Sequence, residues 1–210
     1  MKNELNIVGQ RVARSDSLAK VTGEARYTAD LKLPNMLVAK VLRSPHPHAK
    51  ILKIDYSKAL KVPGVKAAVS GFDSYGIKWG VFRYTQDHAM LHTDKVRYIG
   101  EDVAAVAAVD EETALEALSL IKVDYGPLPA VYDPFESMLD GAPQIHEEYK
   151  NNINIHIHID VGEVDRAMEK AFLVREDTFK AAGEAYAMME PYAVVAVFKN
   201  GFLDLYMPNA

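Results

Sequence analysis

Apolar and polar residues alternate along several short stretches of this chain, which is the period of a half-buried β-strand. In residues 50–56 (KILKIDY), Leu52, Ile54 and Tyr56 are expected together on one face of a strand. Residues 153–160 (INIHIHID) carry isoleucine at every second position. This second stretch predicts the clearest strand of the whole chain.

Other patterns of apolar residues along the chain predict further strands and two helices. The other strands are expected within residues 35–44, 65–73, 95–98, 103–109, 120–127, 173–181, 192–199 and 202–207. A helix is predicted after Asp110, which can accept a hydrogen bond as its N-cap and is followed by two glutamates. Its expected buried face comprises Ala114, Leu115, Leu118 and Ile121. A shorter amphipathic helix is predicted within residues 162–171, and the mixture indicates an α+β fold.

Charge and cysteine content narrow the possible function classes. Lysine and arginine number 24 against 29 aspartates and glutamates, and this net charge of -5 argues against a nucleic-acid-binding surface. The chain has no cysteine, which excludes disulfides, zinc ribbons, iron–sulfur ligation and cysteine nucleophiles within it. The start lacks a signal-peptide core and no apolar run has the length of a membrane span, so a cytoplasmic protein is expected.

The first candidates for a metal site are His46 and His48 in the stretch RSPHPHAKI. Two imidazoles need at least one further donor, and none lies near them in the sequence. Pro45 and Pro47 restrict the backbone and predict a stiff loop between two strands. A structural loop is therefore favoured over a metal site.

Two other histidine pairs raise the same question. His156 and His158 are expected on one face of a strand, roughly 7 Å apart, which is wide for joint ligation of one metal. His88 and His92 stand at i and i+4, which aligns them only on a helix that their neighbours do not support. No metal ligand is predicted from either pair.

The remaining candidate is an acidic residue beside two methionines. Glu190 follows Met188 and Met189 in the stretch GEAYAMMEP, which also contains Tyr186. Glu190 is interpreted either as a buried functional acid or as a strand-end residue that faces solvent, and the second is favoured. The chain contains no GxxxxGK or GxGxxG phosphate loop and no GxSxG motif. The residues alone predict no catalytic or cofactor-binding side chain.

A series of motifs resembles the molybdenum-cofactor-binding large subunit of the xanthine dehydrogenase and aldehyde oxidase family. The motifs are KVTGEARYTADLKLPNMLVAKVLRSPHPHAKILKID, GVKAAVSG, DKVRYIGEDVAAVAAVDEETALEALSLIKVDYGPLPAVYD, IHIDVGEVDRAM and AMMEPYAVVA. They occur in the family's order and cover nearly the whole chain. Such an ordered series is far more specific than any single motif.

The resemblance implies an α/β hammerhead domain followed by the start of a β-rich molybdopterin-binding domain. The hammerhead is expected at residues 20–133, after an N-terminal arm at residues 1–19. The polar and acidic composition of residues 134–151 predicts a linker. Residues 152–210 are expected to form the beginning of the molybdopterin-binding domain, truncated shortly after its last strand.

The resemblance also implies a function for the full-length subunit. It would be a molybdenum-dependent oxidoreductase that hydroxylates a heterocycle, purine or aldehyde-type carbon with water. The molybdopterin, for which the cytosine dinucleotide form is one option, would pass electrons to iron–sulfur clusters and FAD on partner subunits or domains. The pterin loop, substrate pocket and catalytic glutamate are expected beyond Ala210, so this part alone would be inactive.

Three positions depart from the pattern usual in this family. Pro47 replaces the usual alanine between the two histidines, Glu163 replaces the aspartate before the short helix, and Tyr186 stands where histidine is frequent. The substrate is therefore left open. The alternative function is a non-catalytic hammerhead module that docks a partner subunit or binds a metal through His156 and His158.

Overall fold

The structure is a computed structural model that describes residues 7–74, 76–82, 85–185, 187–188 and 190–208. Its helices are α1 (Ser17–Thr22), α2 (Glu111–Ser119), α3 (Pro134–Ser137) and α4 (Val164–Glu169). Its strands are β1 (Val38–Arg43), β2 (Ala49–Asp55), β3 (Val65–Ser70), β4 (Lys78–Trp79), β5 (His88–Ala89), β6 (Lys95–Val96), β7 (Asp102–Ala108), β8 (Lys122–Pro127), β9 (Val195–Lys199) and β10 (Phe202–Tyr206). Among the described residues, no helix combines the length and the apolar character that crossing a membrane requires.

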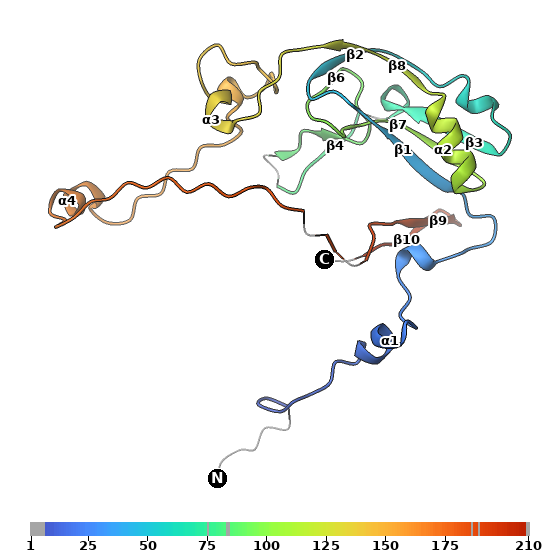
Figure 1. The fold of residues 1–210 in the computed structure, drawn as a ribbon, viewed down its shortest axis with the longest axis horizontal. Helices are drawn as coiled ribbons and strands as arrows, with labels where there is room; N and C mark the ends of the chain where they lie inside the picture. The colour runs from blue at the N-terminus through green and yellow to red at the C-terminus, as the bar shows by residue number, and fades with distance from the viewer. Residues whose placement is uncertain (1–6, 75, 83–84, 186, 189, 209–210) are drawn as a thin grey trace. The chain divides into compact units, whose positions relative to one another are not determined.

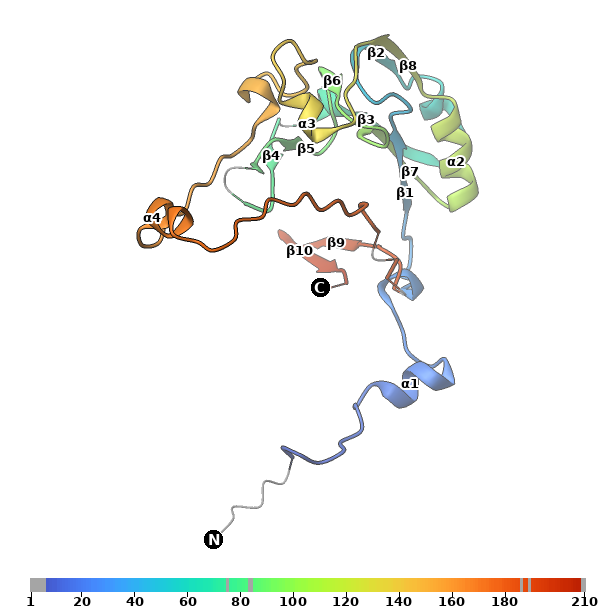
Figure 2. The same ribbon diagram turned by 60° about the vertical axis from the view of Figure 1, so that its left-hand side comes forward.

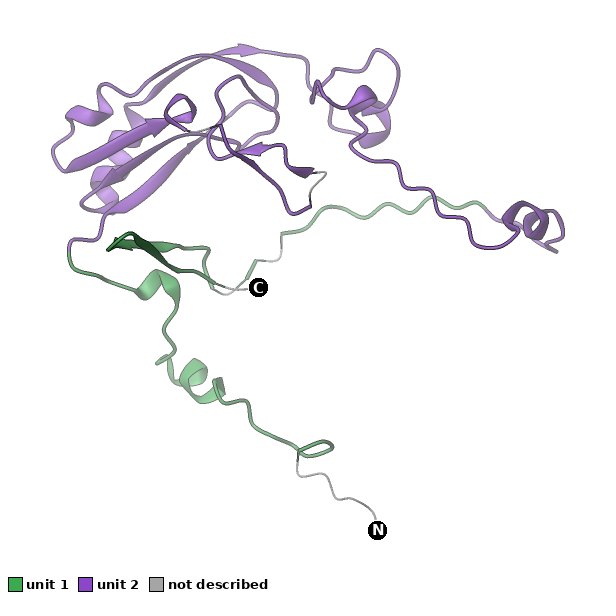
Figure 3. Cartoon of the chain, turned by 180° about the vertical axis from the view of Figure 1, so that it is seen from behind, with its two compact units in different colours: residues 1–34, 176–210 green, residues 35–175 purple. Residues whose placement is uncertain are grey.

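The chain divides into two compact units (Figure 3). One unit comprises residues 35–175 and contains β1 to β8 with α2, α3 and α4. The other comprises residues 1–34 together with residues 176–210 and contains α1, β9 and β10. The mixture of antiparallel sheets and helices confirms the predicted α+β class.

The first sheet of residues 35–175 is antiparallel and has β7 between β1 and β3 (Figure 1). Ala105 of β7 pairs with Val41 on one side and with Val69 on the other. The residues of β7 are buried or half-buried along its whole length, which confirms the strand predicted from the uniform apolar run. A central strand is covered on both faces, so apolar residues are favoured at every position rather than at alternate ones.

Helix α2 packs against this sheet (Figures 1 and 2). The backbone N–H of Thr113 donates a hydrogen bond of 2.8 Å to the Asp110 carboxylate, which confirms the predicted N-cap. The predicted apolar face is wrong at Leu115, whose exposed fraction is 49%, whereas Ala114 and Ala117 are completely buried. The face that contacts the core runs through Ala117, Leu118 and Ile121, and Leu115 lies outside it because successive residues are about 100° apart around a helix.

The second sheet has β2 between β6 and β8, also antiparallel. The register shifts between Ile51, which pairs with Tyr125, and Lys53, which pairs with Asp124. Leu52 therefore lies in a β-bulge and is exposed, while Ile51 is buried. The prediction that Leu52 belongs to the buried face is wrong, because the extra residue of a bulge reverses the alternation of side chains.

Two predicted strands are absent from the described chain. Residues 153–160 and residues 173–181 run without helix or strand, and no described segment pairs with them. The isoleucines of the first stretch are exposed, from 42% at Ile153 to 78% at Ile159. Alternation gives a segment one apolar face, but a strand also requires a neighbouring strand for its backbone hydrogen bonds. The predicted short helix between the two stretches is confirmed as α4.

The other unit contains a β-hairpin formed by β9 and β10, which confirms both predicted strands. Asn200 and Gly201 form its turn with φ of 54° and 81°, the left-handed conformations that an Asn-Gly hairpin turn requires. In the expected N-terminal arm, residues 7–16 have no helix or strand, and α1 begins directly after Asp16.

Candidate functional site

The loop between β1 and β2 holds His46 and His48 in two different environments. The ring of His46 packs edge-on against Tyr125, with ring centroids 4.8 Å apart. His48 is buried, and its Nδ1 lies 2.6 Å from the carbonyl oxygen of Pro129. Ser44 anchors the loop by accepting a hydrogen bond from the His46 N–H on its hydroxyl. The two imidazoles thus pack the ends of β2 and β8, in agreement with the predicted structural loop.

His92 and Glu101 form the most deeply buried ionisable pair among the described residues, and the sequence patterns did not predict this pairing. The Nε2 atom of His92 lies 3.1 Å from Oε1 of Glu101, and the two side chains are 6% and 3% exposed. The other carboxylate oxygen accepts a hydrogen bond from the backbone N–H of Arg97. Glu101 stands immediately before the apolar run of β7, and a charged residue at the start of a buried strand is the signal that could have indicated it.

Burial controls the ionisation of this pair. Burial raises the pKa of Glu101 to about 7, although the backbone N–H and the charge of Arg97 favour the carboxylate. Burial also lowers the pKa of His92, and the charge of Arg97 acts in the same direction. The environment disfavours charge on both partners, so the pair is suited to hold one shared proton near neutral pH.

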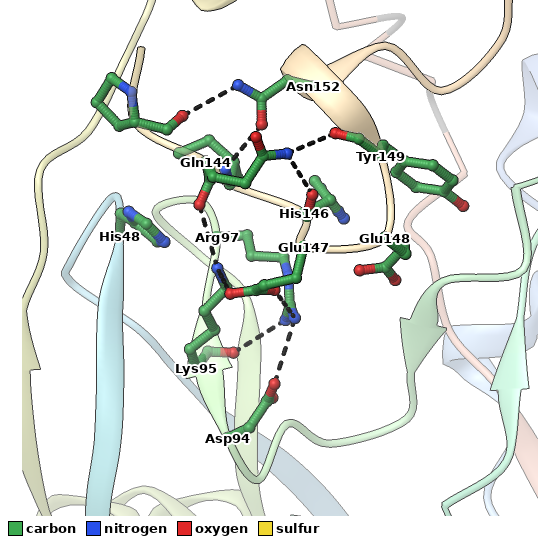
Figure 4. A network of polar contacts seen from close by, with 12 residues as sticks. His48, Asp94, Lys95, Arg97, Gln144, His146, Glu147, Glu148, Tyr149 and Asn152 are labelled. Atoms are coloured by element: carbon green, nitrogen blue, oxygen red, sulfur yellow. Dashed lines mark hydrogen bonds and ion pairs between the residues drawn. The ribbon is translucent and has the colours of Figure 1, made fainter. Parts of the chain in front are cut away.

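Strand β6 and the residue that follows it carry two buried cationic side chains, which Figure 4 shows. Lys95 and Arg97 are only 6% and 11% exposed. The ammonium group of Lys95 donates a hydrogen bond of 2.6 Å to the Glu147 carboxylate. The Arg97 guanidinium lies 3.3 Å from the Asp94 carboxylate and 3.8 Å from that of Glu147. Each buried positive charge therefore has an acidic partner.

Glu147 belongs to the segment that the sequence predicts as a linker. Its neighbours contact the same part of the fold: His146 Nδ1 lies 3.4 Å from the Asp87 carboxylate, and Glu148 lies 3.8 Å from Lys78. Burial lowers the pKa of His146, as does the charge of Arg97. Burial opposes charge on Glu147, but the hydrogen bond from Lys95 and the charges of Lys95 and Arg97 together outweigh it and lower the pKa of its carboxyl group.

A cavity of about 490 Å³ lies against this group of charges. Its charged lining residues are Lys78, Asp87, His92, Asp94 and Arg97. Phe72, Ala89 and Leu91 add apolar surface. The lining is therefore of mixed character, with both signs of charge and apolar groups.

The other histidine candidates are not brought together. His156 is exposed and lies outside any strand, and His158 Nε2 lies 2.7 Å from the neighbouring Asp160 carboxylate. His88 belongs to β5 rather than to a helix, and its ring lies against Trp79. In the part of the chain that the structure describes, no group of three or more histidine and carboxylate side chains could hold a metal ion.

Glu190 accepts a hydrogen bond of 3.2 Å from the backbone N–H of Thr28. Glu190 is half-buried and Thr28 is buried, so the carboxylate connects two segments of one unit that are 162 positions apart. The favoured interpretation of Glu190 as a residue that simply faces solvent is wrong, because no local pattern indicates so distant a partner. Tyr186 and Met189, named with it above, lie outside the described residues.

A molybdopterin cofactor has no complete holding site among these residues. Residues 153–181 are exposed throughout, so they enclose no cradle for a pterin. The lining of the cavity described above comes from residues 71–97. The residues that the structure describes therefore form no complete pterin site.

Comparison with known families identifies the class of protein. The family of the aldehyde oxidase and xanthine dehydrogenase a/b hammerhead domain matches residues 22–129. The molybdopterin cofactor-binding domain family matches residues 145–209. The chain therefore belongs to the aldehyde oxidase and xanthine dehydrogenase family and corresponds to part of its molybdopterin-binding subunit. This confirms the resemblance seen in the sequence motifs.

Individual relatives agree with this assignment. The chain is 34% identical over 205 residues to the nicotinate dehydrogenase large molybdopterin subunit of Eubacterium barkeri, covering 95% of this chain and 46% of that protein. It is 38% identical over 185 residues to a probable xanthine dehydrogenase subunit of Bacillus subtilis, covering 88% and 24%. Among solved structures, CO dehydrogenase from Oligotropha carboxidovorans matches with a TM-score of 0.59 and 36% identity, covering 64% and 17%. The chain thus spans less than half the length of these relatives.

Proposed function

We propose that this chain forms the hammerhead and the beginning of the cofactor-binding region of a molybdenum-dependent oxidoreductase subunit. The observation that carries the proposal is the order of the two family matches along one chain, together with a solved CO dehydrogenase of related fold. In this proposal the hammerhead occupies residues 20–133, and the cofactor-binding region begins near residue 152.

The role proposed for this chain is to frame the active site rather than to perform chemistry. The cofactor, when bound by the whole subunit, supplies the oxidation of substrate carbon and accepts its electrons. In this proposal no step of that reaction is assigned to the described residues. Their contribution is a packed domain built around two three-stranded sheets, with an attached segment, 153–161, whose apolar side chains are exposed.

The substrate and partners are proposed only as classes. Relatives are named for nicotinate, xanthine and carbon monoxide, which supports a small molecule such as a heterocycle, purine or aldehyde-type compound. Another relative is named as a subunit of a dehydrogenase complex, which supports partner subunits that carry iron–sulfur clusters and FAD. A cytoplasmic location and the cytosine dinucleotide form of the pterin belong to the same proposal.

Metal and pterin analysis of the native complex tests the proposal. The complete gene product is purified with its co-purifying subunits, molybdenum is measured by mass spectrometry, and the pterin is identified after oxidation to its fluorescent form. We expect about one molybdenum and one pterin per subunit. Absence of both from protein made in a strain that loads another molybdenum enzyme would contradict the proposal. That result would favour the alternative, a non-catalytic docking module.

A further inference from the structure

The segment Gln144–Asn152, which we call the clasp, has an ordered internal structure. The side chain of Asn152 accepts a hydrogen bond from the Ile145 N–H and donates to the carbonyl oxygens of Ser137 and Pro143. The amide of Gln144 donates to the carbonyl oxygens of His146 and Tyr149 (Figure 4). These bonds order the segment and join its two ends to each other and to the residues just before it.

The hydrogen bonds and ion pairs between the clasp and the hammerhead, among the described residues, use side chains of the hammerhead. The backbone hydrogen bonds of residues 144–152 among the described residues are local, as in Tyr149 to His146 and Asn152 to Tyr149. No backbone–backbone hydrogen bond of the described chain joins them to a sheet. Contacts between ionisable side chains hold the clasp instead. His146, Glu147 and Glu148 are consecutive, and each lies against an ionisable side chain of the hammerhead.

The contact between Glu147 and Lys95 is the strongest of the three. It is short, at 2.6 Å, and its lysine is buried, whereas the contacts of His146 and Glu148 measure 3.4 Å and 3.8 Å. When Glu147 leaves, the Lys95 ammonium keeps only a 3.5 Å contact with the carbonyl oxygen of Gln144, which leaves with the same segment. This hydrogen bond is charge-assisted, so it favours the closed clasp over an open one in which water solvates Lys95.

Three hammerhead residues that hold the clasp also line the cavity of about 490 Å³. Besides Lys95, three places on the hammerhead hold the clasp. They are Lys78 on β4, Asp87 just before β5, and Arg97 just after β6. Lys78, Asp87 and Arg97 all line the cavity. The clasp also carries the first residues of the cofactor-binding family match, which begins at residue 145.

We propose that residues 144–152 form a two-state joint that fastens the start of the cofactor-binding region onto the hammerhead, with the Glu147–Lys95 ion pair as its catch. When the catch is closed, residues 144–152 are held against the hammerhead. The cavity-lining residues Lys78, Asp87 and Arg97 then keep their contacts with the clasp. When the catch is open, residues 144–161 move freely and the cavity-lining charges are exposed to solvent. The inference goes beyond the proposed function and does not depend on whether the subunit binds molybdenum.

Hydrogen exchange on the 210-residue chain tests the joint. In Glu147→Gln, we expect exchange of the hydrogen-bonded amides of Ile145, Tyr149 and Asn152 to accelerate about tenfold or more, since a charge-assisted hydrogen bond holds that segment in place. Exchange in β7 and α2 should not change. Glu148→Gln is the matched control, because it removes the same charge one residue away from a longer contact, and it should leave exchange near the wild-type rate.

A double-mutant cycle with Lys95→Met identifies the catch itself. In the Lys95→Met background the buried charge is gone, so Glu147→Gln should cause no further acceleration. Trypsin cleavage after Lys150 provides a second readout and should rise in parallel with exchange. The proposal is overturned if Glu147→Gln leaves the clasp protected, if it acts equally in the Lys95→Met background, or if exchange rises to the same extent in β7 and α2.

Discussion

The Nε2 atom of His92 lies 3.1 Å from Oε1 of Glu101, and both side chains are almost completely buried beside β7. A glutamate in this position stands out because burial raises its pKa to about 7, well above the value of 4.5 expected for an exposed glutamate. Such a shift makes folding depend on proton binding. The free energy of unfolding of this chain should therefore depend on pH around neutrality.

The substitution Glu101→Gln tests this dependence. The folded-state pKa is raised, so the stabilisation from protonated Glu101 is complete below pH 4.5 and is lost as pH rises through about 7. The loss amounts to at most about 3 kcal/mol. Relative to Glu101→Gln, the wild-type chain should lose stability between pH 5 and pH 8 in chemical denaturation, as the pKa shift predicts.

A control variant distinguishes the titration of Glu101 from the general effect of removing one negative charge. Glu116 is exposed on α2, and Glu116→Gln should follow the wild-type pH profile. The lowered pKa of His92 acts with the opposite sign, because the unfolded chain takes up that proton below about 6.5 and stability then falls toward acid. Parallel profiles for wild type and Glu101→Gln across the whole range would show that Glu101 does not titrate as the structure indicates.

The core of the hammerhead depends on Val106, which is 1% exposed on the central strand β7. Val106→Ala removes two buried methyl groups and leaves a cavity, so the free energy of unfolding should fall by about 2 kcal/mol. Val81 is 84% exposed, and Val81→Ala should change stability by less than about 0.5 kcal/mol. Urea denaturation measures both, and equal losses would contradict the assignment of Val106 to the core.

A close backbone approach requires glycine at position 71. A Cβ atom there would lie 2.5 Å from the carbonyl oxygen of His92 and 2.7 Å from that of Leu91. Gly71→Ala must displace this backbone and should cost about 1–3 kcal/mol, as overpacking does elsewhere. A Cβ at Gly183 meets no atom within 4 Å, so Gly183→Ala should be nearly neutral. Thermal denaturation of both variants provides the comparison, and a neutral Gly71→Ala would refute the close approach.

The contact between Glu190 and Thr28 predicts a local effect on one amide. Removal of the acceptor in Glu190→Ala should accelerate hydrogen exchange at the Thr28 N–H by about tenfold, whereas Glu190→Gln retains an acceptor oxygen and should preserve protection. Glu184→Ala removes an exposed carboxylate from the same region and serves as control. An amide that exchanges at the same rate in all three variants would mean that the bond is not formed in solution.

Local sequence patterns were sufficient to predict a helix or strand where its interactions are close in sequence or its burial is uniform. Asp110 at the start of α2 and the apolar run of β7 both carry their structural signal within a few residues. The ordered motifs also determined the family, since each motif records a local pattern. No distant contact had to be known for these conclusions.

Only the tertiary structure decided the features that depend on distant partners. The bulge that exposes Leu52 arises from pairing with β8, and the isoleucines of residues 153–160 form no strand because no described segment lies beside them. The His92–Glu101 and Lys95–Glu147 pairs join residues 9 and 52 positions apart, and Thr28 meets Glu190 across 162. The sequence determined which segments are able to be helix or strand and to which family they belong. The fold determined which charges are buried together, because burial and ion pairing depend on proximity in space.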